Sequence, residues 1–248
     1  MKRNAVTAAG LLVLMLVPFT FGCQVKNMAS EGGGLLPKEQ VGFSLDQEKD
    51  RISYSLGFDM GRDFQRQNIG VHTEAFTQGV KDGLAGTTSL LTEMEMEQVR
   101  RDFLGEQQAI LARTLGPQAE KTLADGEAFL RENSKKEGVI TLPNGLQYKV
   151  LSPGEGASPG PRQNVKAHYV VRSIDGVELD NSYKLEGPAV FPVDGVIPAW
   201  TVALQMMKEG EKWELYSPAY LAYGEKGVGK VVAPFQTLVF EMELIGIH

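Results

Sequence analysis

The chain has 248 residues, of which 42% are hydrophobic and 23% charged, a composition typical of soluble globular proteins of one or two domains. Its 25 Lys and Arg residues against 31 Asp and Glu residues give a net charge of −6. No basic stripe is present that could neutralise phosphates, so nucleic acid is not expected as a partner.

Residues 1–22 have the pattern of a secretory signal peptide. Lys2 and Arg3 precede an uncharged stretch from Asn4 to Gly22 with an apolar centre. The alternative is a membrane-spanning anchor, because a stretch of about 19 uncharged residues is near the minimum length of a span. Pro18 and many small residues interrupt its apolar character, so we expect a cleaved signal and export from the cytoplasm.

Cys23 is the only cysteine of the chain and directly follows this stretch. A lone cysteine in an exported protein has no internal disulfide partner and is reactive unless it is modified. The preceding residues resemble the lipobox of bacterial lipoproteins: Gly22 fits its position, but Thr20 stands where leucine is usual. We expect a lipid-modified Cys23 that anchors the chain to a membrane, with plain secretion as the alternative. Gln24 implies sorting to the outer membrane.

Residues 23–44 are predicted to form a flexible tether, because glycine and polar residues predominate and apolar side chains are few. Residues 45–137 are predicted to be helical, because apolar residues recur at every fourth position and strand-type alternation is absent. The recurring apolar residues are Ile52, Leu56, Met60 and Phe64, followed by Phe76, Val80 and Leu84.

Two signals subdivide this helical region. Thr92 and Glu95 have the spacing of a capping box that opens a long helix, and Gly116-Pro117 is expected to end or kink it. The apolar stripes of the region are short and flanked by many charged residues, so a monomer does not bury them fully. We therefore expect these helices to form a homodimer.

From residue 138 to residue 248 the apolar pattern changes to alternation, which predicts strands. Asn144-Gly145 and Asp175-Gly176 lie between alternating segments and predict hairpin turns. Further strands are predicted at residues 213–215 and 238–245.

One amphipathic helix interrupts these strands. It is predicted to begin at Pro198 and to stop at Gly210. Its apolar positions are Trp200, Ala203, Leu204 and Met207. Several antiparallel strands with a single helix predict an α+β fold in which the sheet wraps on the helix.

The residue types do not favour hydrolytic or metal chemistry. The three histidines are scattered, and no HExxH, CxxC or Gly-x-Ser-x-Gly motif occurs. His168 is interpreted as a surface or hydrogen-bonded residue, and neither a metal nor a cofactor is expected. Aromatic and β-branched residues are dense around the predicted turns, where packing in a core is their ordinary role.

Short motifs follow one another in this region: Val-Lys-Ala-His-Tyr at 165–169, Ile-Asp-Gly-Val-Glu-Leu-Asp-Asn-Ser at 174–182, Val-Ile-Pro-Ala-Trp at 196–200, Leu-Ala-Tyr-Gly-Glu-Lys-Gly at 221–227 and Thr-Leu-Val-Phe-Glu at 237–241. In sequence and in order they resemble the motifs of the FKBP-type prolyl cis/trans isomerases. Upstream segments resemble the macrophage infectivity potentiator and FkpA-like subfamily. They are Ser-Tyr-Ser-Leu-Gly at 53–57, Gly-Glu-Ala-Phe-Leu-Arg-Glu-Asn at 126–133 and Leu-Pro-Asn-Gly-Leu-Gln-Tyr-Lys at 142–149.

The resemblance implies a pocket for a prolyl residue and the helical dimerisation region with a long connecting helix that this subfamily has. The substrate-binding residues that it implies are Tyr169, Leu179, Phe191 and Phe240 as walls, Trp200 as floor, Val196 and Ile197 beside the floor, and Val232 on the far side. It further implies that the Ile197 backbone N–H binds a substrate carbonyl. Asp180, near that carbonyl, and Tyr223, a hydroxyl donor, are the implied catalytic residues.

The chain departs from the family pattern around this pocket. Leu179 and Leu185 replace a wall phenylalanine and an arginine that pairs with Asp180. The pocket is therefore expected to be wider and the carboxylate less firmly oriented. Ala199 and Ala233 replace a glycine and a proline, which is expected to shift the start of the helix and to loosen the loop after Tyr223.

We therefore predict an exported peptidyl-prolyl cis/trans isomerase that acts on unfolded or exported polypeptides containing proline. It would be a periplasm-facing lipoprotein of the bacterial envelope, placed at the outer membrane, and would assist folding. Macrolide-type inhibitors are expected to bind its pocket. The alternative is a chaperone or interaction lipoprotein of the same fold with weak or no isomerase activity. A structural lipoprotein without a ligand would leave the pocket residues unexplained.

Overall fold

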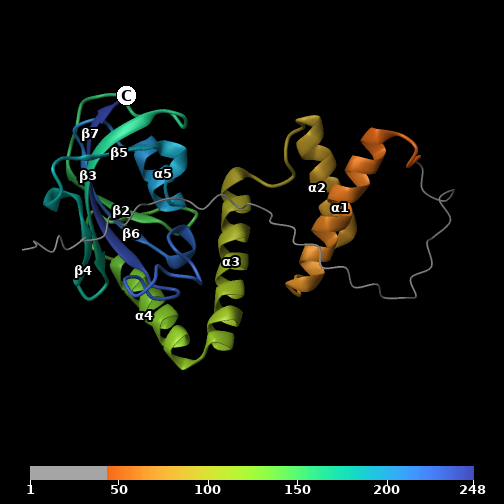
Figure 1. The fold of residues 1–248 in the computed structure, drawn as a ribbon, viewed down its shortest axis with the longest axis horizontal. Coiled ribbons are helices and arrows are strands. Elements are labelled where there is room, and N and C mark those ends of the chain that lie inside the picture. The colour runs from red at the N-terminus through yellow and green to blue at the C-terminus, as the bar shows by residue number, and fades with distance from the viewer. Residues whose placement is uncertain (1–43) are drawn as a thin grey trace, which may run out of the picture. The chain divides into compact units, whose positions relative to one another are not determined.

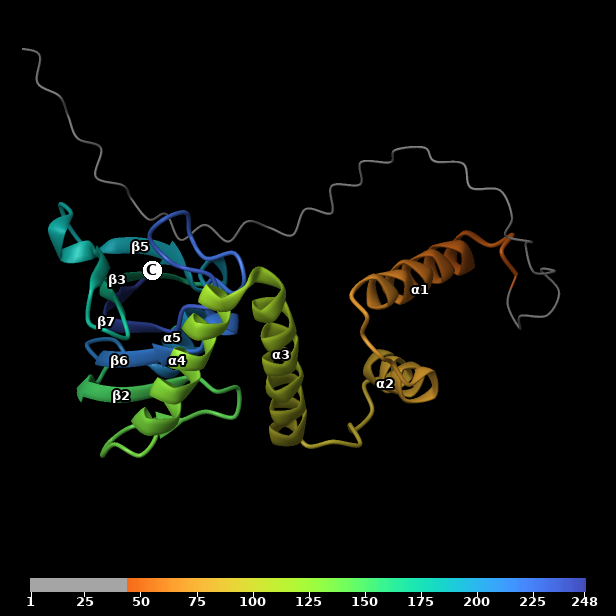
Figure 2. The same cartoon turned by 90° about the horizontal axis from the view of Figure 1, so that it is seen from below.

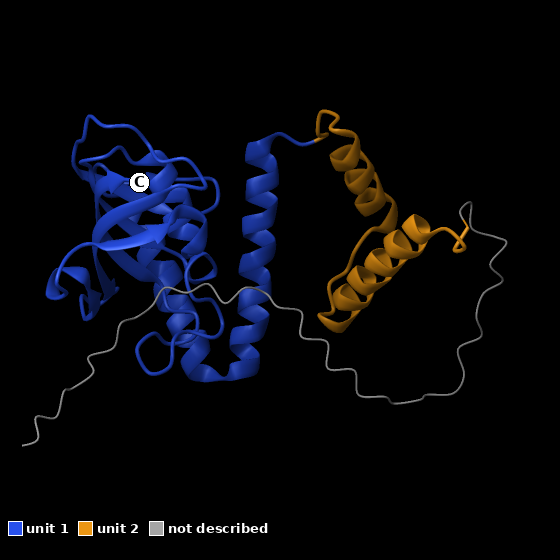
Figure 3. Ribbon diagram, turned by 45° about the horizontal axis from the view of Figure 1, so that its top comes forward, with its two compact units in different colours: residues 1–20, 91–248 blue, residues 21–90 orange. Residues whose placement is uncertain are grey.

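The computed structural model describes residues 44–248, so the expected signal peptide, Cys23 and nearly all of the expected tether lie outside the described residues. Internal contacts divide the described chain into two compact units, residues 44–90 and Leu91–His248 (Figure 3). Each unit is described by itself. No helix within residues 44–248 has the length and apolar character that a membrane span requires.

The first unit consists of two helices, α1 (Glu48–Arg66) and α2 (Thr73–Ala85). The Phe64 and Phe76 rings meet edge to face, with 5.5 Å between their centroids, and join the two helices. No residue of either helix is buried. Leu56 is 62% exposed and Leu84 is 86% exposed, so the predicted apolar stripes lie largely open in the single chain.

The second unit begins with α3 (Glu93–Leu115) and α4 (Pro117–Asn133). The predicted capping box is present: the Glu95 N–H donates to Thr92 Oγ1 (3.2 Å) and the Thr92 N–H donates to the Glu95 carboxylate (2.8 Å). Gly116 separates the helices with φ of +102°, a conformation that glycine adopts readily, and Pro117 suits the first helical turn because it lacks an N–H.

The stretch expected to carry one long connecting helix therefore holds two helices. They meet at Gly116, contact each other next to that corner and diverge away from it (Figures 1 and 2). Gly116-Pro117 ends α3, as the sequence predicts, and also reverses the direction of the chain.

An antiparallel sheet of seven strands follows, in the order β1-β2-β6-β7-β3-β4, with β5 paired to β3. The helix α5 (Pro198–Met206) lies against one face of the sheet (Figure 1). The strands are β1 (Ile140–Thr141), β2 (Gln147–Ser152), β3 (Asn164–Ser173), β4 (Glu178–Asn181), β5 (Ala189–Pro192), β6 (Lys212–Ser217) and β7 (Leu238–Ile247), with single helical turns η2 (Ser182–Lys184), η3 (Val193–Gly195) and η4 (Ala219–Leu221). The predicted α+β fold is confirmed.

Both predicted hairpins are present. Gly145 and Gly176 have φ of +87° and +82°, and the Asn144 side chain accepts the Leu146 N–H at 3.1 Å. β4 and β5 lie along the same edge of β3, paired to residues 170–172 and 164–167 respectively.

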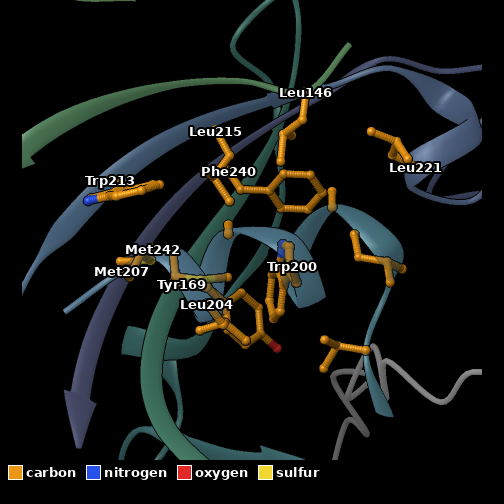
Figure 4. Close-up of a cluster of buried hydrophobic side chains, with 14 of the residues drawn as sticks. Leu146, Tyr169, Trp200, Leu204, Met207, Trp213, Leu215, Leu221, Phe240 and Met242 are labelled. Carbon is orange, nitrogen blue, oxygen red and sulfur yellow. The ribbon is translucent and has the colours of Figure 1, made fainter. Parts of the chain in front are cut away.

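The core fills the space between α5 and the sheet (Figure 4). Apolar residues of α5 recur at helical spacing and meet side chains from alternate positions of β6 and β7. The labelled core residues are Leu146, Tyr169, Trp200, Leu204, Met207, Trp213, Leu215, Leu221, Phe240 and Met242. α5 ends at Met206, before the predicted stop at Gly210, and Met207 continues into the core with no exposed surface.

Polar and steric contacts fasten α4 to the sheet. The buried Asn133 donates to Gln147 Oε1 at 3.0 Å, and the Gln147 amide donates to the Leu130 carbonyl at 2.8 Å. Gly126 lies directly against Thr237, where a Cβ would overlap the threonine side chain. α4 is therefore an integral part of the C-terminal domain.

Candidate active site

Trp200 lies at the centre of the predicted pocket. Pro198 opens α5, and Trp200 in its first turn is fully buried. Three aromatic rings surround the indole: Tyr169 from β3 at 4.9 Å, Phe191 from β5 at 5.4 Å and Phe240 from β7 at 5.6 Å between centroids. The Tyr169 and Phe240 rings meet the indole edge to face, an arrangement that fixes its orientation.

The structure brings the predicted pocket residues together. Val196, Ile197, Val232, Tyr169 and Phe240 are buried in one cluster with Trp200. Leu179, Phe191 and Tyr223 are partly buried and pack against this cluster. Residues from β3, β4, β5, β7, α5 and the loop after η4 thus meet at one place, although they are spread over 72 positions of the chain, from 169 to 240.

Asp180 joins this cluster through two hydrogen bonds. Its carboxylate accepts the Tyr169 hydroxyl at 3.0 Å and the backbone N–H of Asn181 at 2.8 Å. None of the ion pairs among residues 44–248 includes Asp180, and Leu185 is 42% exposed. The missing arginine thus leaves the carboxylate without a cation partner, and the two hydrogen bonds orient it instead.

Ser182 supports Tyr169 from the other side. The fully buried Ser182 hydroxyl accepts the Tyr169 N–H at 2.7 Å and donates to the Tyr169 carbonyl at 3.1 Å. His168 Nδ1 lies 3.1 Å from the same hydroxyl, and its ring stacks on Tyr183 at 4.1 Å. His168 is therefore a hydrogen-bonded residue of the sheet, in agreement with the interpretation from sequence.

Three donor groups of residues in or against this cluster have no partner within the described residues. The Tyr223 hydroxyl and the Trp200 Nε1 are buried and have no hydrogen-bond partner among residues 44–248. The Ile197 N–H, at the start of α5, also donates to no acceptor in the described chain. A buried donor without a partner costs about 1–3 kcal/mol, so these groups favour a ligand that supplies acceptors.

The pKa values of the two pocket tyrosines are raised. Burial raises the pKa of Tyr223 to about 12, and the nearby Asp180 charge adds to the shift. Burial also raises the pKa of Tyr169, with further contributions from the charge and the hydrogen bond of Asp180. Both phenols therefore remain protonated at neutral pH and are hydrogen-bond donors.

Residues 222–236, which we call the pocket loop, carry Tyr223 and Val232. Gly227 has φ of +57°, and a Cβ there would overlap the Val232 carbonyl, so only glycine allows this close approach. The Val228 N–H donates to the same carbonyl at 2.8 Å. The Ala233 N–H, which a proline would lack, donates to Gln236 Oε1 at 2.8 Å, so the substitution adds a hydrogen bond to the loop.

The sequence does not predict β5 as a strand. Phe191, a predicted wall residue, lies on it, but β5 is only four residues long and carries no turn signal that distinguishes it from a loop. The departure at Ala199 leaves the helix start in place: α5 begins at Pro198, and Ala199 is fully buried.

Two family models match the chain. Residues 49–150 match the domain amino terminal to FKBP-type peptidyl-prolyl isomerase, and residues 156–245 match the FKBP-type peptidyl-prolyl cis-trans isomerase. The antiparallel sheet wrapped on α5 and the aromatic cluster around Trp200 thus define an FKBP-type isomerase domain.

Curated relatives cover most of the chain. The "Outer membrane protein MIP" of Legionella longbeachae is 41% identical over 82% of this chain and 88% of its own length. The FKBP-type 22 kDa peptidyl-prolyl cis-trans isomerase of Escherichia coli is 38% identical over 82% of this chain and 98% of its own length. The crystal structure of FkpA from Escherichia coli, 32% identical, matches 82% of this chain and 98% of that chain with a TM-score of 0.51.

The chain therefore belongs to the FKBP-type peptidyl-prolyl cis-trans isomerase family. Within it, the chain also has the domain amino terminal to the isomerase, and relatives named Mip and FkpA match it at 39% and 31% identity. The protein is an enzyme, a peptidyl-prolyl cis-trans isomerase.

Proposed function

We propose that this isomerase acts on X-Pro bonds by binding the twisted amide in the pocket whose floor is Trp200. Rotation about the C–N bond has a barrier of about 20 kcal/mol because the planar amide must lose its resonance. The twisted amide is less dipolar than the planar one, so an apolar cavity that excludes water favours the transition state. No nucleophile or proton transfer is required.

Each pocket residue has a distinct role in this mechanism. The aromatic walls Tyr169, Phe191 and Phe240 surround the prolyl ring. The Ile197 N–H binds a substrate carbonyl, and Tyr223 donates a second hydrogen bond. The single observation that carries the proposal is that residues of the aromatic cluster carry these donors without partners in the described part of the chain. Leu179 completes one wall, and Val196 and Val232 close the sides.

Tyr223→Phe tests the proposed donor. Removal of the hydroxyl is expected to lower kcat/KM for an X-Pro peptide with an apolar X about twofold to tenfold, because a hydrogen bond contributes about 0.5–1.5 kcal/mol. The measurement is cis-to-trans conversion followed in the full chain and in the variant. A wild-type rate no faster than the uncatalysed reaction would contradict the mechanism, and an unchanged rate in the variant would contradict the role of Tyr223.

Thr77→Val serves as the matched control, because it also removes one hydroxyl. Its hydroxyl donates only to the Thr73 carbonyl of its own helix, in the other unit. This variant is expected to keep the wild-type rate, so that an effect of Tyr223→Phe is assigned to the pocket. Macrolide-type inhibitors, which we propose bind the same pocket, are expected to compete with the peptide.

We further propose that the enzyme is a periplasm-facing lipoprotein of the outer membrane, anchored through a lipidated Cys23. The signal-like pattern of residues 1–22, the lipobox-like residues before Cys23 and the outer-membrane name of the Legionella relative support this location. Unfolded exported polypeptides are then its substrates, and folding assistance is its role. Mass spectrometry of the mature N-terminus distinguishes lipidation from plain secretion.

We propose that α1 and α2 form a homodimer, because their apolar stripes lie exposed in the single chain. Leu56→Glu places a charge on the exposed stripe of α1 and is expected to convert a dimer to a monomer in sedimentation velocity. Ser55→Glu, also exposed on α1 but on its polar side, is expected to remain dimeric. A monomeric wild-type chain, or a dimeric Leu56→Glu variant, would place the interface elsewhere.

A further inference from the structure

Phe235, in the pocket loop, has a backbone conformation that its side chain does not favour. Its φ is +58°, one of two positive values at non-glycine residues within 44–248. Bulky residues rarely adopt the left-handed region, which asparagine and glycine tolerate better. The Phe235 side chain is nevertheless fully buried. A contact of this side chain therefore compensates for the cost of the backbone conformation.

That contact is with the corner between α3 and α4, which we call the elbow (residues 112–119). Phe235 packs in a small cluster with Ala112 of α3, Ala119 of α4 and Ala219 of η4, and Leu123 lies against it. The alanines leave room for a phenyl ring. The cluster is separate from the main core, so it joins the elbow only to the pocket loop and η4.

α3 makes a second contact with the C-terminal domain, away from this cluster. Arg101 donates to the Pro143 carbonyl at 2.8 Å, in the turn of the β1–β2 hairpin. The same turn accepts the Tyr220 hydroxyl on the Asn144 carbonyl at 2.9 Å. α3 is thus fixed to the domain at Arg101 and at Ala112, about three turns apart on the helix.

Phe235 is directly connected to the pocket. Its backbone N–H donates to the Gly224 carbonyl at 2.9 Å, next to Tyr223. Val232, three residues before Phe235, contributes to the core around Trp200. A shift of Phe235 would therefore move the segments that carry both Tyr223 and Val232.

We propose that Phe235 is a positioning residue for the isomerase reaction: its side chain, held by the α3–α4 elbow, fixes the pocket loop so that Tyr223 and Val232 meet the substrate. The packing of α3 against Phe235 then sets the affinity of the pocket for its peptide substrate. The proposal rests on the proposed roles of Tyr223 and Val232, and it assigns a function to Gly116, which turns α3 back toward the loop.

Phe235→Asn in the full chain tests this coupling. Asparagine tolerates the left-handed backbone and removes the phenyl ring. KM for an X-Pro peptide is expected to rise about fivefold with kcat within about twofold, because the loop contacts ground state and transition state alike. Phe235→Leu, which retains an apolar side chain, is expected to restore KM to within about twofold of wild type. General misfolding would instead reduce the active fraction and hence kcat.

Ala112→Arg disrupts the same contact from the side of α3 and leaves the sequence of the pocket loop unchanged. It is expected to reproduce the rise in KM, whereas Thr114→Arg, exposed on the same helix, is expected to leave KM unchanged. The double variant Phe235→Asn with Ala112→Arg is expected to raise KM no further than the larger single change, because both break one contact.

An unchanged KM in Phe235→Asn would overturn the proposal, and so would additive effects of Phe235→Asn and Ala112→Arg on KM. If Ala112→Arg fails to fold, the comparison of KM between Phe235→Asn and Phe235→Leu tests the proposal by itself. If the proposed role of Tyr223 is wrong, Tyr223→Phe will keep the wild-type rate. If only the coupling between Phe235 and the pocket is wrong, Tyr223→Phe will be impaired and Phe235→Asn will be unaffected.

Discussion

Trp200→Ala is expected to lower the free energy of unfolding of the C-terminal domain by about 3–5 kcal/mol, the range measured for buried aromatic residues replaced by alanine. Trp200 is fully buried and touches Tyr169, Phe191 and Phe240, so the variant leaves a cavity where three rings now meet. Because these rings come from three different strands, local collapse would not close the cavity.

Tryptophan fluorescence during urea unfolding measures this effect selectively. The chain has two tryptophans, and both lie in the C-terminal domain, so Trp213 remains as the reporter when Trp200 is replaced. A loss below about 1 kcal/mol would contradict the central position of Trp200. Trp213→Phe is the matched control, with Trp200 as the reporter. It keeps an aromatic ring against Tyr148, so it should lower the free energy of unfolding less than Trp200→Ala does.

Asp180→Leu is expected to lower kcat/KM for X-Pro peptides about tenfold to a hundredfold. Hydrogen bonds to charged groups contribute about 1.5–3 kcal/mol, and about 1.4 kcal/mol corresponds to a factor of ten in rate. Leucine has a similar size but accepts no hydrogen bond, so the Tyr169 hydroxyl and the Asn181 N–H would both lose their partner. The wall of the pocket would then lose its orientation.

Asp180→Asn separates charge from hydrogen bonding. Its amide oxygen still accepts from the Tyr169 hydroxyl, so the loss of kcat/KM should be smaller than in Asp180→Leu. Both variants should lower the pKa of Tyr169, because the charge of Asp180 contributes to raising it. Ultraviolet titration of the tyrosines measures that change. Full activity in Asp180→Leu would remove Asp180 from the site, whatever the titration shows.

Local signals in the sequence predicted most of the C-terminal fold. The Asn144-Gly145 turn, the capping box at Thr92 and the start of α5 at Pro198 depend on residues close in sequence, and each is present in the structure. The pocket followed from the order of short family motifs. Periodicity alone predicted only a core that is rich in aromatic residues.

Contacts between distant residues were the part that the sequence did not reveal. Gly116-Pro117 predicted the end of a helix, but the direction of the next helix depends on Ala112, Ala119 and Phe235, which meet only in three dimensions. The sequence also predicted a less firmly oriented Asp180 carboxylate than the structure has, for the same reason. The loss of an arginine is visible in sequence, whereas the hydrogen bond from Tyr169, eleven residues earlier, is not.

The turn at Gly116 also shortens the distance between the catalytic domain and the segment that precedes α3. A continuous helix over residues 93–133 would be a rod of about 60 Å, at about 1.5 Å per residue. Because the chain instead turns sharply at Gly116 and α3 binds the Pro143 carbonyl through Arg101, the segment before α3 leaves from the flank of the catalytic domain. In a dimer joined through α1 and α2, the separation of the two pockets would then depend on residues 86–92 and not on a rod.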